Sequence, residues 1–61
     1  MAVDTKNVFP TVNGKLYRVT FTRGGRALCA IRRFDGKDQG AALVLDGVLG
    51  RKVVAAGKAL L

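Results

Sequence analysis

The sequence has no histidine, no tryptophan, one cysteine and only four acidic residues among 61. A single cysteine excludes an internal disulfide, and without histidine a zinc site lacks its usual ligands. The same shortage excludes Cys–His catalysis, and the four aspartates are too few and too closely tied to turn signals to form an acid/base pair. The sequence therefore indicates a protein that is not an enzyme and that holds no metal or cofactor.

Long hydrophobic runs are also missing. The most apolar stretch, AALVL at residues 41–45, is far too short to span a bilayer and is followed by Asp46. The N-terminus has no cationic, apolar leader, and one free cysteine suits a reducing compartment. We expect a cytoplasmic protein, or one enclosed in a virion or other assembly, with no membrane partner.

The length allows one small domain, residues 1–61, with a limited core. A hydrophobic content of 49% argues against disorder. A chain of this size buries only about 60% of the surface that its unfolded form exposes, and small domains often gain stability from partners. We therefore expect either a homo-oligomer or a subunit of a larger complex.

Turn dipeptides recur every eleven residues: Asn13-Gly14, Gly24-Gly25, Asp35-Gly36 and Asp46-Gly47. Such pairs favour two-residue hairpin turns, because these turns require positive φ angles. Short strands separated by turns at this spacing are typical of antiparallel sheets. The sequence predicts a mainly-β or α+β domain built on an antiparallel meander of three to four strands.

Pairing residues across the first three turns sorts the side chains into two faces. Val8 then lies opposite Val19, and Val19 opposite Ala30. The predicted core face is Val8, Val12, Tyr17, Val19, Phe21, Leu28, Ala30, Phe34, Ala41, Leu43 and Leu45. The three aromatic residues of this set are assigned to the core rather than to base stacking, and Pro10 suits an edge strand.

The segment after the fourth turn has two interpretations. A hairpin at Asp46-Gly47 would place Lys52 opposite Ala41 on the apolar face, which breaks the register. At helical spacing, Leu49, Val53, Ala56 and Leu60 form one stripe, with Asp46 as N-cap and two costly interior glycines. We predict a C-terminal helix packed on the sheet. The alternative is a fifth strand that closes a small all-β barrel.

The charge of +7 favours an anionic partner, and six basic residues occur between positions 15 and 33 without one acid. Alternation along the strands places Arg32 on the core side and Arg18 and Arg33 on the outer face, while Arg23 and Arg26 lie at a hairpin tip. The leading hypothesis is a nucleic-acid-binding module that uses this outer face and tip. Its predicted contact residues are Lys15, Arg18, Thr20, Thr22, Arg23, Arg26 and Arg33. The competing interpretation of the same arginines is the solvated side of a small sheet.

A second hypothesis rests on apolar residues of the outer face. Phe9, Leu16 and Ile31 interrupt its polar surface and are predicted partner-contact residues; Phe9 is also a candidate for base stacking. They favour a structural or interaction protein, such as a small subunit of a phage particle or an inhibitor from a phage or mobile element. A third option is that residues 47–61 form a cationic amphipathic helix on membranes, but docking of this helix on the sheet is preferred.

Overall fold

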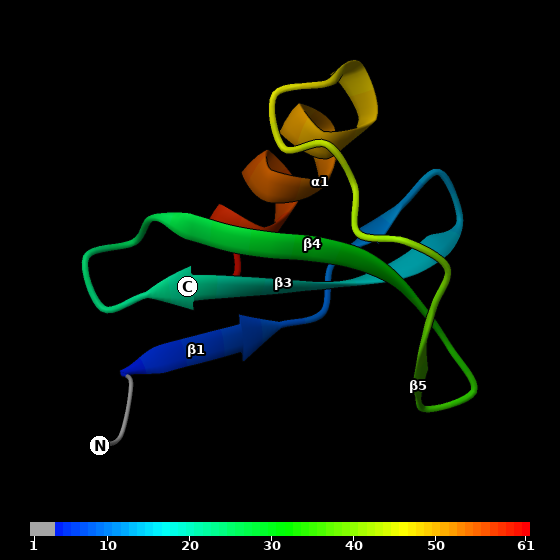
Figure 1. Cartoon of the computed structure of the whole chain (residues 1–61), viewed down its shortest axis with the longest axis horizontal. Coiled ribbons are helices and arrows are strands. Elements are labelled where there is room, and N and C mark those ends of the chain that lie inside the picture. The colour runs from blue at the N-terminus through cyan, green and yellow to red at the C-terminus, as the bar shows by residue number, and fades with distance from the viewer. Residues whose placement is uncertain (1–3) are drawn as a thin grey trace.

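The chain forms a curled antiparallel sheet with a C-terminal helix on one face, in a computed structural model that describes residues 4–61 (Figure 1). The elements are β1 (Thr5–Val8), β2 (Thr11–Val12), β3 (Lys15–Thr22), β4 (Ala27–Phe34), β5 (Lys37–Gln39) and α1 (Val48–Lys58). The strand order is β1-β3-β4-β5, and β2 also pairs with β3. The predicted meander with a C-terminal helix is confirmed, and the barrel alternative is wrong because residues 48–58 are helical.

Two of the turns have the predicted backbone. Asn13 and Gly14 have φ angles of 53° and 76°, and Asp35 and Gly36 have 53° and 75°. Each pair closes a two-residue turn, since Val12 pairs with Lys15 and Phe34 pairs with Lys37. Positive φ at both positions matches the right-handed twist of the flanking strands.

The turn at Gly24-Gly25 departs from the prediction. The amide of Thr22 donates to the carbonyl of Arg26 (2.8 Å), so the loop contains residues 23–25, and only Gly25 has positive φ, at 85°. A bulge then restores the expected register, because Phe21 pairs with Ala27 but Thr20 pairs with Cys29. Leu28 is the extra residue of this bulge. It is 49% exposed instead of buried opposite Phe21.

The first strand is broken at Phe9-Pro10, which separates β1 from β2. Pro10 donates no ladder hydrogen bond, but its carbonyl accepts one from the amide of Tyr17 at 2.9 Å. Val8 pairs with Val19, as predicted. The break therefore keeps both short strands on β3 and leaves Pro10 at the edge of the sheet.

The sheet pairing stops after β5, where Gly40 has a φ of 73°. Residues 40–47 then turn back toward α1, and the amide of Leu43 donates to the carbonyl of Ala30 at 2.7 Å. Leu43 and Leu45 pack partly over the core, whereas Ala41 is exposed. The Asp46-Gly47 turn opens a helix rather than a hairpin, and the N-cap is Gly47, without a side-chain cap, rather than Asp46.

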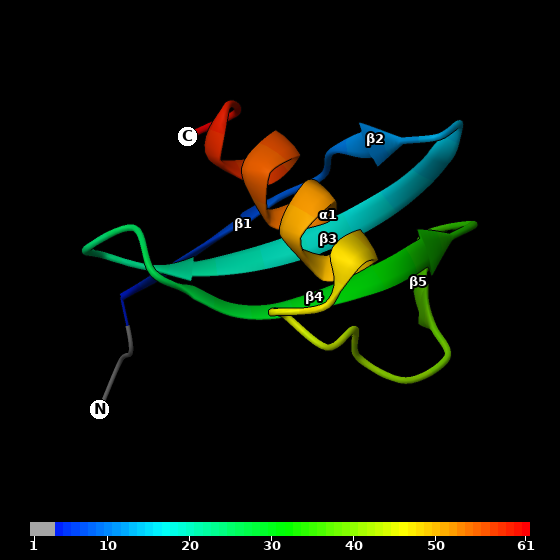
Figure 2. The same cartoon turned by 90° about the horizontal axis from the view of Figure 1, so that it is seen from above.

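The helix lies obliquely across the sheet (Figure 2). Two of its glycines face neighbours that leave little or no room for a side chain. Its buried line is Gly50, Val53 and Gly57, rather than the predicted Leu49, Val53, Ala56 and Leu60. A Cβ added at Gly57 would lie 3.2 Å from the side chains of Val19 and Phe21. At Gly50 it would lie 2.0 Å from the Val44 carbonyl oxygen. These glycines are therefore required for packing, which outweighs their poor helix propensity.

The core lies between α1 and the covered face of the sheet, here called the inner face. Its buried apolar residues are Val8, Tyr17, Val19, Phe21, Ala30 and Val53, with Val12, Ala27, Leu43, Leu45 and Val54 partly buried around them. Of the predicted core, Leu28, Phe34 and Ala41 are exposed instead. The bulge displaces Leu28, Ala41 follows the end of β5, and Phe34 flanks a turn at the end of the sheet.

Replacing Gly50 by alanine is expected to lower the free energy of unfolding by about 1 to 3 kcal/mol, although alanine favours helix by about 1 kcal/mol. The cause is the collision of the new methyl group with the Val44 backbone. Gly57→Ala should cost less, because its neighbours are side-chain atoms at 3.2 Å. Urea denaturation followed by circular dichroism measures both effects.

Gly24→Ala is the matched control, because its φ is not positive and its new Cβ would meet only Thr22 Oγ1, at 3.9 Å. We expect the stability of this variant to change little. Equal stability of Gly50→Ala and the native protein would contradict the packing described above.

Candidate nucleic-acid interface

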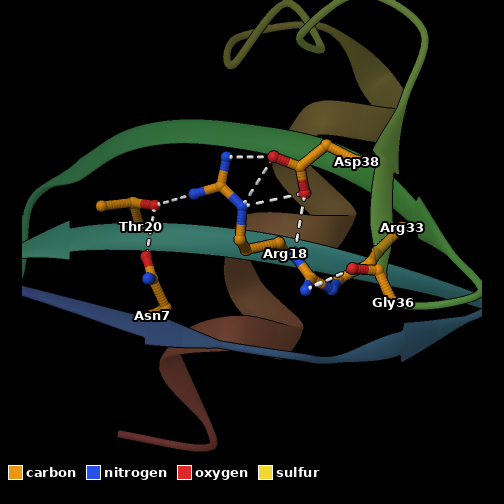
Figure 3. Close-up of polar contacts among 6 residues, drawn as sticks. All are labelled: Asn7, Arg18, Thr20, Arg33, Gly36 and Asp38. Atoms are coloured by element: carbon orange, nitrogen blue, oxygen red, sulfur yellow. Dashed lines mark hydrogen bonds and ion pairs between the residues drawn. The ribbon is translucent and has the colours of Figure 1, made fainter.

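Three strands contribute to an ion-pair cluster on the outer face of the sheet, opposite α1 (Figure 3). Asp38 of β5 accepts hydrogen bonds from Nη2 of Arg18 on β3 at 2.9 Å and from Nη1 of Arg33 on β4 at 3.1 Å. Nε of Arg18 also donates to both carboxylate oxygens, at 3.1 and 3.2 Å. Arg33 and Asp38 are cross-strand partners in the β4–β5 register, and Arg18 is an additional partner of Asp38.

Arg18 extends this cluster toward the first strand. Its Nη1 donates to Thr20 Oγ1 at 2.5 Å, and Thr20 Oγ1 donates to Asn7 Oδ1 at 2.6 Å. A chain of polar contacts thus links β1, β3 and β5 (Figure 3). Arg33 is held from its other side, since Nη2 donates to the carbonyl of Gly36 at 2.8 Å. The hydrogen-bonding groups of Arg18 and Thr20 are therefore largely used within the protein.

The cluster changes the electrostatics of the outer face. Hydrogen bonds from Arg18, reinforced by the charges of Arg18 and Arg33, hold the pKa of Asp38 below its ordinary value against a smaller desolvation effect. The same hydrogen bond to Asp38 raises the pKa of Arg18. One carboxylate between two guanidinium groups leaves this cluster with a single net positive charge. The outer face is consequently less basic than its sequence predicts.

The predicted partner-contact residues lie beside this cluster. Phe9 is 46% exposed, and the guanidinium carbon of Arg33 lies 5.2 Å from its ring centroid, a cation–π contact. Leu16 is 40% exposed and Ile31 is half-buried. Cys29 is half-buried on the same face, opposite Thr20. The outer face thus combines a satisfied polar network with scattered apolar side chains.

The β3–β4 hairpin tip carries two arginines, of which only Arg23 forms an ion pair among residues 4–61. Arg23 Nη1 lies 3.3 Å from Asp4 Oδ2, and both side chains are strongly exposed, at 85% and 69%. Arg26 is exposed, while its backbone amide donates to Thr22 Oγ1 at 3.1 Å. A surface depression beside the tip is lined in part by Lys6, Thr22 and Arg23. Thr22 therefore supports the turn, and the arginines project from it.

A second exposed group occurs at the uncovered end of the inner face. Phe34 pairs with Lys37 across the β4–β5 turn and is 59% exposed. Arg32 precedes it by two residues on the same strand and is also exposed. Sequence reasoning missed this group because it assigned Phe34 to the core. The position of Phe34 next to a turn, at the end of the predicted strands, was the available signal.

Most cations of the described chain lie outside ion pairs. All eleven Lys and Arg residues fall within residues 4–61, and the ion pairs there involve Arg18, Arg23 and Arg33, which leaves eight others. The eight are all exposed: Lys6, Lys15, Arg26, Arg32, Lys37, Arg51, Lys52 and Lys58. The positive charge is therefore distributed over the surface instead of being neutralised by the four aspartates.

Comparison with known proteins finds no matching family model, no matching curated protein and no matching solved structure. Within residues 4–61, no three side chains of the metal-binding types gather into a site. In the same part of the chain, no helix is long and apolar enough to cross a membrane.

The lowered pKa of Asp38 makes stability dependent on pH. The folded-state pKa lies below the unfolded value, so this carboxylate stabilises the fold above about pH 4 and the contribution is lost as the pH falls through the folded-state pKa. We expect Asp38→Asn to lower the melting temperature at neutral pH and to flatten its decline in acid. Thermal melts between about pH 2 and 7 measure both effects.

Asp35→Asn is the matched control, because it removes the same charge from the adjacent turn and asparagine tolerates the positive φ of that position. Its acid profile should resemble that of the native protein. If both variants flatten the profile equally, the Asp38 cluster is not the source of the pH dependence.

Proposed function

We propose that the protein binds nucleic acid without catalysis, through contacts between surface cations and phosphates. The observation that carries this proposal is the exposure of eight cations outside ion pairs in the described chain, on a protein of charge +7. Each lysine or arginine that neutralises a phosphate releases a condensed counterion, which is the main source of affinity in sequence-independent binding. A distributed set of cations is suited to this mode of binding.

The β3–β4 tip is the preferred phosphate contact. Arg23 and Arg26 project from it, and Lys6 lines the depression beside it. The strongly exposed pair between Arg23 and Asp4 is weak, so a phosphate can replace the aspartate at little cost. Arg18 and Arg33 have a different role in this proposal, because Asp38 already binds them and they fix the relative positions of the strands.

A structural or interaction protein is the second candidate, supported by large apolar side chains at the surface. On the outer face, Phe9 and Leu16 are 46% and 40% exposed. Near the start of α1, Val44 and Val48 are 70% and 78% exposed. Association with a partner or with another copy of the chain would bury such side chains. Light scattering separates the candidates, since a stable oligomer with no nucleic-acid affinity favours this second function.

The proposed function predicts a steep loss of affinity with salt. The logarithm of the binding constant should fall linearly with the logarithm of salt concentration, by roughly 0.9 for each duplex phosphate contacted. Arg23→Gln combined with Arg26→Gln should reduce this slope by about 2. Fluorescence anisotropy with labelled duplex and single-stranded oligonucleotides, at several salt concentrations, measures the slopes.

Arg51→Gln combined with Lys58→Gln removes the same charge from the exposed side of α1, where residues seven apart share a face. We expect this control to change the slope by much less. Equal reductions in both double variants would contradict contact through the tip. Absence of binding to either kind of oligonucleotide at low salt would overturn the proposed function as a whole.

A further inference from the structure

Arg32, Phe34 and Lys37 form an exposed aromatic and basic patch, here called the Phe34 patch. Phe34 and Lys37 are directly opposite in the β4–β5 register, a position that places their Cβ atoms roughly 5 Å apart. Arg32 is two residues from Phe34 and shares its side of β4. Phe34, which is 59% exposed, thus has one basic residue two positions earlier on its strand and another across the turn.

Arg32 and Lys37 take part in none of the ion pairs found among residues 4–61. Asp38 pairs with Arg33 on the opposite side, where Arg18 and Arg33 both bind its carboxylate. The other nearby acid, Asp35, belongs to the turn itself. The ion-pair cluster of the outer face therefore leaves the cations of the Phe34 patch without a carboxylate among residues 4–61. The patch therefore has two cations against the single carboxylate of the adjacent turn, and its net positive charge attracts an anionic partner.

We propose that the Phe34 patch binds single-stranded nucleic acid, with one unpaired base stacked on the Phe34 ring and flanking phosphates on Arg32 and Lys37. This inference rests on the proposed function and adds a preference for single strands to it. An aromatic platform beside a cationic surface is the combination that recognises such strands, because every base has a face that can stack. In a duplex the base faces are already stacked on one another and are not available to Phe34.

Self-association explains the patch less well. A symmetric dimer brings the same surface of two copies together, so Arg32 and Lys37 of one copy would face the like charges of the other. Juxtaposed like charges oppose association. An acidic partner protein satisfies the charges, but it does not account for an exposed ring between them as a stacking base does.

The test uses Phe34→Trp, which keeps an aromatic platform and introduces the sole tryptophan of the chain. Indole fluorescence, excited selectively over Tyr17, is quenched when a base stacks on the ring. An oligothymidylate of about 12 nucleotides should quench it at saturation, whereas a duplex of equal length should quench it little. Phe9→Trp is the matched control on the outer face, where we expect weak quenching by both ligands.

Affinity gives a second readout. Phe34→Leu should weaken binding of the single strand about tenfold and leave duplex affinity within about twofold. Because Phe34 is 59% exposed, the variant should keep the native circular dichroism spectrum. Arg32→Gln combined with Lys37→Gln should reduce the salt slope for the single strand more than the α1 control, Arg51→Gln combined with Lys58→Gln.

The outcomes separate this inference from the proposed function. Salt-dependent binding without quenching of the Phe34→Trp variant overturns the inference and leaves the proposed function in place. No binding to either ligand overturns both. A change in indole fluorescence with protein concentration alone, or quenching by an acidic protein but by no oligonucleotide, would identify a protein-binding surface and overturn the inference.

Discussion

The close contact between α1 and the inner face of the sheet is the constraint on which the rest of the structure depends. Gly57 lets the helix meet Val19 and Phe21, and Gly50 lets it meet the backbone at Val44. Val53, between these glycines, is fully buried. A small chain has little apolar surface to bury. The distance between α1 and the sheet therefore largely determines how completely water is excluded from the core. This contact also fixes which part of the inner face stays open.

The distribution of acids then determines which cations remain available. Asp38 binds Arg18 and Arg33 on the outer face, and its position on the short strand β5 brings a carboxylate within reach of two strands. The outer face is thereby stabilised and partly neutralised. The cations of the hairpin tip, the Phe34 patch and the exposed side of α1 keep their charge. Binding of an anionic polymer is proposed for these surfaces, and the Asp38 cluster links the strands β3, β4 and β5 that carry the tip and the Phe34 patch.

The candidate site was only partly predictable from the sequence. Arg23 and Arg26 were assigned to a hairpin tip from the Gly24-Gly25 signal, and they lie there. The Arg18–Asp38 contact was not foreseen, because it joins strands that are not neighbours and depends on the curl of the sheet. Phe34 was assigned to the core because alternation gives the side of a strand but not the extent of the helix that covers it.

By itself the sequence determined the features that depend on a few adjacent residues. Asn13-Gly14 and Asp35-Gly36 closed the predicted turns, since these residues tolerate positive φ, and the second turn fixed the Arg33–Asp38 pairing. Tertiary structure decided the rest. The Gly47 N-cap and the requirement for Gly50 and Gly57 follow from fitting a helix onto a curled sheet. That fit depends on distances between distant segments, which no local pattern of residues specifies.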